Sequence, residues 1–281
     1  MLNQLSYFPG CSLETTAKEG DNSLRLIFEQ CDVKINELKD WNCCGSASAH
    51  AIDHELSTSL PSRNLSLAPR GVPVLVPCPN CYLRLKLSHM ELVKNESARQ
   101  QYERLWNRDF DPDLKIVTFL ETIQAMSEEG AFEKFKDGLK GLKVACYYGC
   151  MLARPPVMRK QKTLHGYMEE ILTSLGAEAL QWNSATKCCG TFLTVTQTEV
   201  ANQTIRTVLS DAEDAEAQCI VTPCAMCQMN LEMRTHLGDK MPILHLSEVL
   251  PLAMGIGGGR GWFRRHLIDP RPLLKSKSLI N

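Results

Sequence analysis

Short apolar runs alternate with helical spacings along this chain. The runs Val74–Val76 and Cys219–Thr222 are each followed by a proline, and we interpret both as short buried strands. Residues 142–147 form a third apolar run, which predicts a strand that leads to Cys150. Strands that alternate with helices are typical of α/β proteins, so the pattern predicts an α/β unit in each half of the chain.

Helical spacing is clearest immediately before Gly176, where a helix is predicted to end. Further helices are predicted over residues 201–212 and 119–126. Each of two Cys-x-x-Cys motifs also opens an apolar segment of helical spacing. The helix before Gly176 carries its apolar residues three or four positions apart: Leu164, Tyr167, Met168, Ile171, Leu172 and Leu175.

The chain contains two copies of one cysteine pattern. Each copy has a single Cys, a spacer of 31 or 37 residues, a Cys-Cys-Gly element, and a Cys-x-x-Cys motif that follows the Cys-Cys pair after 33 or 34 residues. We infer an internal duplication. Ten of the 13 cysteines belong to the pattern: a first thiol set of Cys11, Cys43, Cys44, Cys78 and Cys81, and a second thiol set of Cys150, Cys188, Cys189, Cys224 and Cys227.

The duplication predicts two tandem, homologous, Rossmann-like cysteine-rich domains, residues 1–140 and 141–281. We interpret the polar stretch 108–141 as the linker between them. A C-terminal tail with six basic residues and one acidic residue, Asp269, follows the second copy and predicts a solvated or docking face. The glycine-rich segment 255–261 lacks the Gly-x-Gly-x-x-Gly register of a dinucleotide site, so it predicts a loop.

Composition indicates a folded globular protein. The chain has 281 residues, of which 44% are hydrophobic and 22% charged, and it is long enough to build a core without disulfides. A formal net charge of −1 gives no indication of nucleic-acid binding. Because neither a secretory signal nor a membrane span of about 20 apolar residues is visible, we expect a cytoplasmic location. Cysteines stay reduced there, and regularly spaced reduced cysteines indicate metal or redox chemistry.

The arrangement of the thiols favours an iron–sulfur cluster over zinc. A structural zinc takes four ligands, whereas each copy offers five thiols, two of them adjacent. Adjacent side chains of an extended chain point to opposite sides, so directing both to one site requires a bend, which Gly45 and Gly190 permit. A cluster of several irons accepts thiolates at separate positions. A zinc-stabilised interaction module is the alternative.

Other cysteine chemistries explain less of the pattern. A disulfide between adjacent cysteines is strained, and the expected compartment is reducing. A thioredoxin-like Cys-x-x-Cys is a further alternative, because a helix N-terminus lowers a thiol pKa, but it leaves six of the ten cysteines unexplained. The ferredoxin spacing Cys-x2-Cys-x2-Cys-x3-Cys is absent. Without a dinucleotide motif, electrons are expected to come from or go to another protein.

The doubled pattern resembles the B subunit of heterodisulfide reductase. The resemblance runs from Cys11 to Cys227 and leaves the basic tail outside the motifs. It implies that each thiol set binds one [4Fe-4S] cluster of the noncubane type through all five of its cysteines. Cys146 lies four residues before Cys150, but the glycine that precedes Cys150 repeats the one before Cys11, so we choose Cys150 as the ligand.

The resemblance also implies a mechanism and partners. A small thiol or disulfide substrate would lie between the two clusters, each of which would supply one electron. Partners would be a ferredoxin-type protein like the C subunit of that enzyme and a flavoprotein like its A subunit. A second hypothesis is a pure electron-transfer role, which would resemble the Cys-Cys-Gly subunits of some succinate, lactate or glycolate oxidoreductases. Proximity in sequence makes His50, His54, Tyr147 and Tyr148 candidate proton donors.

The remaining residues have simpler interpretations. His50 and His54 lie four apart and would share one face if their segment is helical, so we expect a packed or exposed helix face. Trp41 and Trp182 each precede a Cys-Cys pair and are expected to pack in the core or shield a cluster. The other three cysteines, Cys31, Cys146 and Cys219, are expected to be small buried apolar residues.

Overall fold

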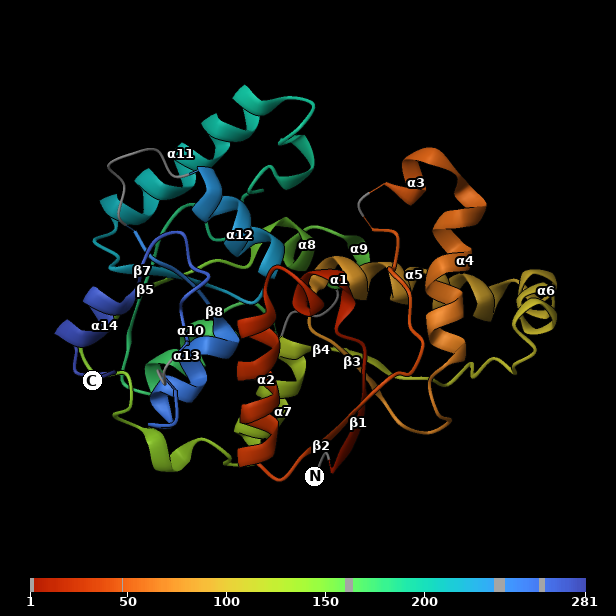
Figure 1. Ribbon diagram of the computed structural model, residues 1–281, viewed down its shortest axis with the longest axis horizontal. Coiled ribbons are helices and arrows are strands. Elements are labelled where there is room, and N and C mark those ends of the chain that lie inside the picture. Colours follow the sequence, from red (N-terminus) through yellow and green to blue (C-terminus); the bar gives the residue numbers. More distant parts are fainter. Residues whose placement is uncertain (1–2, 47, 160–163, 235–240, 258–260) are drawn as a thin grey trace.

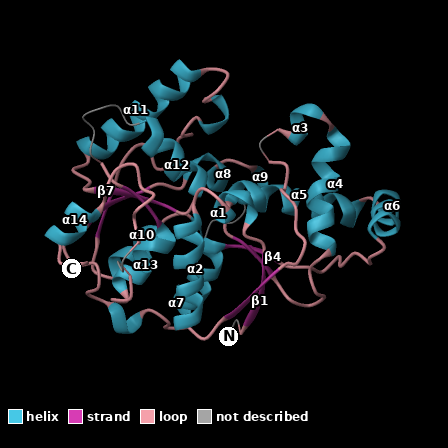
Figure 2. Ribbon diagram, viewed as in Figure 1, coloured by secondary structure: helices cyan, strands magenta, loops and turns pink. Residues whose placement is uncertain are grey.

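Two parallel four-stranded sheets, one in each half of the chain, form the frame of the molecule (Figure 1, Figure 2). The computed structural model describes residues 3–46, 48–159, 164–234, 241–257 and 261–281. The sheets have the strand orders β2-β1-β3-β4 and β6-β5-β7-β8, which are the same order in two copies. The predicted α/β class and the internal duplication are therefore confirmed.

The two halves repeat the order of their four strands and differ in some of the helices between them. The first half contains β1 Gln4–Tyr7, α1 Gly10–Glu14, α2 Lys18–Gln30, β2 Lys34–Glu37, α3 Ala49–Ile52, α4 His54–Ser66, β3 Val74–Val76, α5 Pro79–Lys94, α6 Glu96–Trp106, β4 Ile116–Thr118 and α7 Phe119–Glu128. The connection between the halves contains η1 Glu133–Phe135. The second half contains β5 Lys143–Cys146, α8 Gly149–Ala153, α9 Pro156–Arg159, α10 Tyr167–Ser174, β6 Glu178–Leu180, η3 Thr191–Leu193, α11 Thr198–Asp214, β7 Cys219–Thr222, α12 Ala225–Arg234, β8 Ile243–His245, α13 Leu246–Ala253 and α14 Arg271–Ser276.

Most apolar runs form the predicted elements, with two differences. The strands β3 and β7 coincide with the two predicted runs. The helix predicted from Leu164 begins only at Tyr167, because Gly166 precedes it with a left-handed φ of 84°. The strand β4 lies inside the predicted linker, where three residues among polar neighbours give little signal, and it pairs with β3. Because β5 starts at Lys143, we keep residue 140 as the proposed division.

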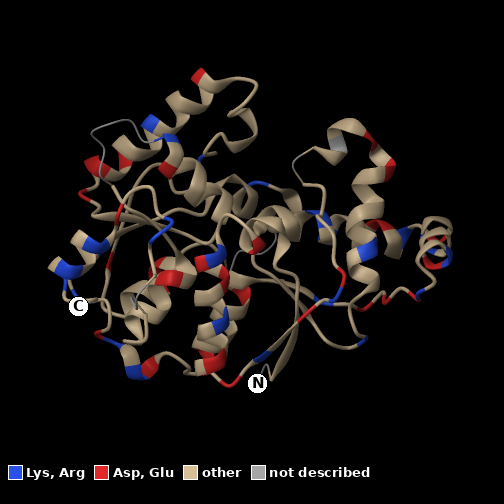
Figure 3. Ribbon diagram, viewed as in Figure 1, with Lys and Arg blue, Asp and Glu red and all other residues tan. Residues whose placement is uncertain are grey.

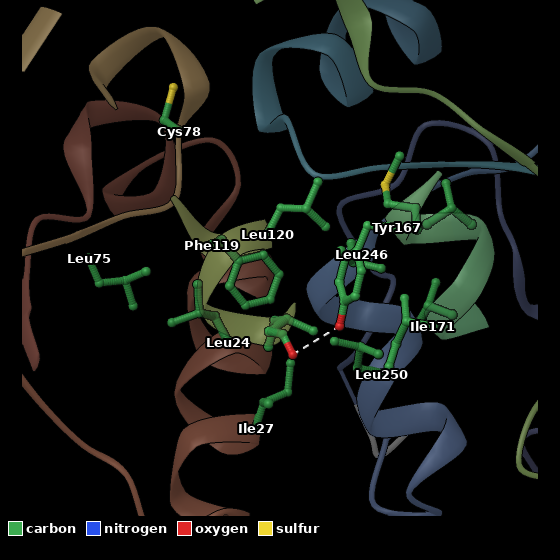
Figure 4. Packing of buried hydrophobic residues seen from close by; sticks show 14 of the residues in the cluster. Leu24, Ile27, Leu75, Cys78, Phe119, Leu120, Tyr167, Ile171, Leu246 and Leu250 are labelled. Atoms are coloured by element: carbon green, nitrogen blue, oxygen red, sulfur yellow. Dashed lines mark hydrogen bonds between the residues drawn. The ribbon is translucent and has the colours of Figure 1, made fainter. Parts of the chain in front are cut away.

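The halves share a hydrophobic core in which two pairs of helices pack across the junction, and the second half has a further buried cluster of its own. Helix α2 packs on α13, and α7 packs on α10. Helix α2 precedes β2 as α10 precedes β6, and α7 follows β4 as α13 follows β8, so each of these helices has a counterpart in the other half. Exchanging the counterparts turns one helix contact into the other, which is the relation that an approximate two-fold axis gives. Figure 4 shows this layer, with Leu24, Phe119, Ile171 and Leu250 contributed by the four helices. The Tyr167 hydroxyl donates to the Ile123 carbonyl across it at 3.1 Å.

The C-terminal tail is only in part the predicted solvated or docking face. Its charged residues on α14 lie at the surface (Figure 3), but Phe263 and Leu274 are buried in the core. Arg265 also forms an ion pair with Glu19 of α2 at 3.1 Å. The apolar residues of the tail therefore anchor it to the body, while residues 258–260 lie outside the described part. None of the helices in the described ranges has the length and apolarity that crossing a bilayer requires.

Candidate metal centres

Both thiol sets lie where strands end. In the first half Cys11 follows β1, the Cys-Cys pair follows β2, and Cys78 follows β3. The second half repeats this placement after β5, β6 and β7. Because the strands of each sheet are parallel, their carboxyl ends meet at one edge, which is the usual ligand-binding edge of an open α/β sheet. The topology alone thus gathers five thiols at each sheet.

The five thiols of the first set form a continuous chain of contacts. Cys11 hydrogen-bonds to Cys43, and Cys43 to its neighbour Cys44. The Sγ atoms of Cys44 and Cys81 are 3.1 Å apart, and Cys81 hydrogen-bonds to Cys78. Cys11 and Cys43 are exposed, whereas the other three are buried. All five predicted residues are therefore brought together, with one side open to solvent.

The second set repeats the arrangement with less exposure. Cys150 and Cys188 have Sγ atoms 3.6 Å apart and are half-buried. The Sγ atoms of Cys189 and Cys227 are 3.5 Å apart, and Cys227 also hydrogen-bonds to Cys224. The Cys189 thiol contacts the Thr191 hydroxyl at 2.9 Å as well. All five members of the second set therefore converge too.

Cys146 stays outside the second set. It is fully buried in β5, and its carbonyl accepts a hydrogen bond from Trp182 Nε1 at 3.0 Å. Cys219 is likewise fully buried, as predicted. Cys31, predicted to be buried, is only half-buried at the end of α2, where it packs against the core. Because Cys146 is buried in β5 while Cys150 contacts Cys188, the geometry agrees with the choice of Cys150 over Cys146 as the ligand.

Glycines allow the thiols to approach one another. Gly45 and Gly190 follow the Cys-Cys pairs with φ of +73° and +77°, which supplies the expected bend. A β-carbon on Gly10 would lie 2.9 Å from Cys81 Sγ, and one on Gly149 would lie 3.2 Å from Cys227 Sγ. The helices that carry the two single cysteines therefore begin against a Cys-x-x-Cys thiol of their own set.

Contacts between the thiols shift their pKa values in opposite directions. Hydrogen bonding with Cys11 lowers the pKa of Cys43, and hydrogen bonding with Cys150 lowers the pKa of Cys188. The same hydrogen bonds raise the pKa values of Cys11 and Cys150. Neighbouring thiols cannot all ionise cheaply, because like charges repel each other. Five packed thiolates therefore need a compensating positive charge, and metal ions provide it.

A polynuclear cluster fits this donor set better than a single ion. Each set offers five thiols, one more than a tetrahedral structural zinc takes, and the thiols contact one another as neighbours around each site. Soft thiolates are the ligands that hold iron–sulfur clusters, whose separate irons accept separate sulfurs. The residues present thus fit the group that the sequence predicts.

The two sets face each other across the approximate two-fold axis. Helix α1, which carries Cys11, packs on α12, which carries Cys227; correspondingly α8, with Cys150, packs on α5, with Cys81. The two Cys-x-x-Cys motifs also meet directly at the first turns of α5 and α12, because Asn80 Nδ2 contacts Met226 Sδ at 3.3 Å. Asn80 is buried, and its Oδ1 has no hydrogen-bond partner. Each of these two residues directly precedes the second cysteine of its Cys-x-x-Cys motif, but the cysteine spacing alone did not predict that they meet.

The candidate proton donors are not equivalent. His54 is exposed and begins α4, while the side chain of His50 lies outside the described part of the structure. The two histidines do not share one helix face as predicted, because Asp53 is extended and caps α4 through the Leu56 amide.

Only one of the two candidate tyrosines lies against a thiol set. Tyr148 points away from the second set and donates to Glu169. Tyr147 lies against that set, where burial raises its pKa, and it donates to the Lys187 carbonyl at 2.6 Å. Tyr147 and Tyr148 are therefore neighbours in sequence, but their side chains have different surroundings, and only Tyr147 lies near the thiols.

The aromatic residues before the Cys-Cys pairs pack as expected. Trp41 contacts Phe8 edge to face, with ring centroids 5.4 Å apart. Trp182 contacts Tyr147 at 6.0 Å. Phe8 and Tyr147 occupy the same place relative to Gly10 and Gly149, so the two halves differ there by one hydroxyl group.

A pocket of about 300 Å³ lies between the halves, beside the second set. Its wall comes from the α1–α2 turn, α12 and the C-terminal tail, and it includes Ala225, the residue after Cys224. His266 is buried there between Glu232, at 2.6 Å, and Glu248, at 3.0 Å. No sequence pattern connects these three residues, so the motifs did not reveal them.

Comparison with known proteins agrees with the duplicated pattern. A family model described as a cysteine-rich domain, CCG, matches residues 5–86 and 144–232. The chain belongs to this family. It is 30% identical to the 8-methylmenaquinol:fumarate reductase membrane anchor subunit of Wolinella succinogenes, over 97% of this chain and the whole of that protein. It is 25% identical to the B subunit of the ferredoxin/F420H2-dependent CoB-CoM heterodisulfide reductase of Methanosarcina acetivorans, over 90% of this chain and 89% of that protein.

A solved structure shares the fold. A hypothetical protein from Helicobacter pylori superimposes with a TM-score of 0.72 at 14% sequence identity, over 92% of this chain. This chain spans only 50% of that structure's length, and the likeness concerns the fold alone. The predicted resemblance to the B subunit of heterodisulfide reductase is confirmed at the level of the family, while the fumarate reductase relative keeps the electron-transfer alternative open.

Proposed function

We propose that this chain is the two-cluster iron–sulfur subunit of a multi-subunit oxidoreductase, similar to the B subunit of heterodisulfide reductase. Each thiol set would hold one [4Fe-4S] cluster of the noncubane type through its five cysteines. The observation that carries the proposal is the pair of matched five-thiol sets, whose helices pack on each other where the two halves meet. Its free thiols fit the cytoplasmic location that we also propose.

The proposed reaction is the reduction or formation of a disulfide or persulfide. Cleaving a disulfide takes two electrons and two protons and yields two thiols, and the clusters, when bound, would supply one electron each. The protein's own residues would exclude water and hold the substrate. Asn80, whose buried amide oxygen has no partner where the two Cys-x-x-Cys motifs meet, is the group best placed to orient a substrate there. The pocket beside α12 gives small molecules access to the junction of the halves.

Electron transfer without a sulfur substrate is the second candidate. Three observations favour it, of which the first two are that the relative at 30% identity is part of a fumarate reductase and that Asn80 of one Cys-x-x-Cys motif contacts Met226 of the other directly. None of the ten cysteines lines the pocket of about 300 Å³. In this role the chain would pass electrons between partners. We propose as partners a ferredoxin-type protein and a flavoprotein, as in the heterodisulfide reductases.

Anaerobic purification tests both candidates. Iron and acid-labile sulfide are measured per chain, and paramagnetic resonance spectra are recorded with and without an added thiol. About eight irons per chain, with a signal that appears only with the thiol, supports the sulfur-substrate role. The same iron content with no response to the thiol supports the electron-transfer role. Zinc in place of iron overturns both.

A further inference from the structure

The peptide carbonyl before each Cys-Cys pair is held by a side chain in both halves, but by different residues. In the first half the Asn42 carbonyl accepts from Asn64 Nδ2 at 2.9 Å. In the second half the Lys187 carbonyl accepts from the Tyr147 hydroxyl at 2.6 Å. Each bond fixes the backbone one residue before the first cysteine of the pair. Equivalent positions are thus restrained by unrelated chemistry.

The second half needs a different restraint because its loop is longer. Four more residues, 184–187, separate the Trp-Asn dipeptide from the Cys-Cys pair than in the first half. The Ala185 carbonyl accepts from the amides of Tyr148 and Gly149, at 2.8 and 3.1 Å. Lys187 Nζ forms an ion pair with Asp211 at 2.9 Å. Residues 184–187 are therefore held by several hydrogen bonds and one ion pair, and the hydrogen bond from Tyr147 is to the residue directly before Cys188.

Tyr147 reaches this carbonyl from beside the thiols themselves. Its ring occupies the place that Phe8 occupies in the first half: the β-carbon built on Gly149 would be 3.6 Å from Tyr147 Cε1, and that built on Gly10 would be 3.6 Å from Phe8 Cε1. The two rings thus pack alike, and only the hydroxyl differs. The Tyr147 hydroxyl proton is used in the hydrogen bond to the Lys187 carbonyl, so this geometry favours a structural role over proton donation.

We propose that Tyr147 is a positioning residue of the second metal centre, and that it holds Cys188 through the Lys187 carbonyl as Asn64 holds Cys43 through the Asn42 carbonyl. The inference rests on the proposed clusters. Losing the bond would loosen the insertion and admit water to the second centre. Because a reduced cluster carries more negative charge, added solvation favours reduction there, and the midpoint potential of that centre rises.

The first measurement is redox titration of the iron-loaded full-length chain, followed by paramagnetic resonance. Chains with one disabled set, Cys81→Ser or Cys227→Ser, assign each reduction wave to its centre. In Tyr147→Phe the wave of the second centre is expected to move to higher potential, with the first unchanged. In Asn64→Ala the wave of the first centre is expected to move instead. Tyr148→Phe, which removes a neighbouring hydroxyl that donates to Glu169 and not to the loop before Cys188, should move neither.

The second measurement does not depend on iron. Alkylation of each thiol in the iron-free full-length chain is followed by mass spectrometry. In Tyr147→Phe, the alkylation rate of Cys188 is expected to rise about fivefold, while the rate of Cys43 stays the same. The factor is the one by which the loss of one typical hydrogen bond changes a local opening equilibrium. Unchanged alkylation, or a potential shift of equal size at both centres, would overturn the role of Tyr147. A wild-type chain that binds no iron overturns the proposed function instead, while alkylation still decides whether Tyr147 holds Cys188.

Discussion

The two thiol sets share their framework and differ in their surroundings. Each lies at the ends of three strands, β1, β2 and β3 for the first set and the corresponding β5, β6 and β7 for the second, and each packs a glycine against a Cys-x-x-Cys thiol. The first set leaves Cys11 and Cys43 exposed, whereas Cys150 and Cys188 of the second set are half-buried. The two halves have therefore kept the strand arrangement that brings the thiols together, but they differ in how far the thiols are exposed to solvent. Two centres of one type are therefore expected to have unequal potentials, because solvent exposure tunes an iron–sulfur site.

The largest expected effect comes from disabling one set at a time. Cys81→Ser and Cys227→Ser each replace the buried thiol that contacts the Cys-Cys pair of its own set. Iron per chain is expected to fall from about eight to about four in either variant, because a hydroxyl is a poor ligand for iron–sulfur clusters. Iron and sulfide analysis checks this. Cys219→Ser, in a strand outside both sets, is the control and should retain all the iron. Loss of both centres from one substitution would show that the sets do not form independently.

The second comparison concerns the helix caps that end the two sheets. Glu121 caps α7 by accepting from the Thr118 amide at 2.7 Å, and Glu248 caps α13 by accepting from the His245 amide at 2.8 Å. Only Glu248 also binds His266, which Glu232 contacts from the other side. All three side chains of this cluster are almost fully buried. In the second half, therefore, the glutamate that caps the last helix after the sheet also binds His266 of the C-terminal tail.

His266→Ala is expected to lower the free energy of unfolding by about 3–5 kcal/mol, because it leaves two buried carboxylates without their partner. Urea unfolding followed by circular dichroism measures it. Glu121→Gln keeps an acceptor for the cap of the first half and is expected to cost less than about 1 kcal/mol. Equal losses in the two variants would mean that the His266 cluster contributes no more than an ordinary cap.

The same cluster predicts a pH dependence of stability. Burial lowers the pKa of His266, but hydrogen bonds to Glu232 and Glu248 outweigh burial and raise that pKa to about 10. The pKa of an unfolded histidine is about 6.5. The stabilisation is therefore fully present below about pH 6.5 and is lost as the pH rises toward about 10. Unfolding at several pH values in this window should show wild type approaching His266→Ala as the pH rises. A constant difference between them contradicts the prediction.

The sequence could group the cysteines that lie near one another but not the residues that surround them, and the reason is physical. Spacing along the chain determines which cysteines follow which strands, so the ten residues could be grouped before the fold was known. Short strands such as β4, with three residues among polar neighbours, give no periodic signal, and the helix before Gly176 begins later than its apolar residues suggest. The His266 cluster and the contact of Asn80 with Met226 join residues from distant segments. Such contacts depend on packing, which no local pattern encodes.

The smallest effect is expected where the two Cys-x-x-Cys motifs meet. Asn80→Leu removes a buried amide oxygen that has no partner, together with one weak contact to sulfur. We expect the free energy of unfolding to rise by up to about 1 kcal/mol, because an unsatisfied buried group costs more than that contact contributes. Met226→Leu leaves the whole amide unsatisfied and should lower stability by a similar amount. Chemical unfolding of the substrate-free chains measures both. If Asn80→Leu is instead less stable and also abolishes a thiol-dependent paramagnetic signal, the amide holds a sulfur substrate, and the electron-transfer role is excluded.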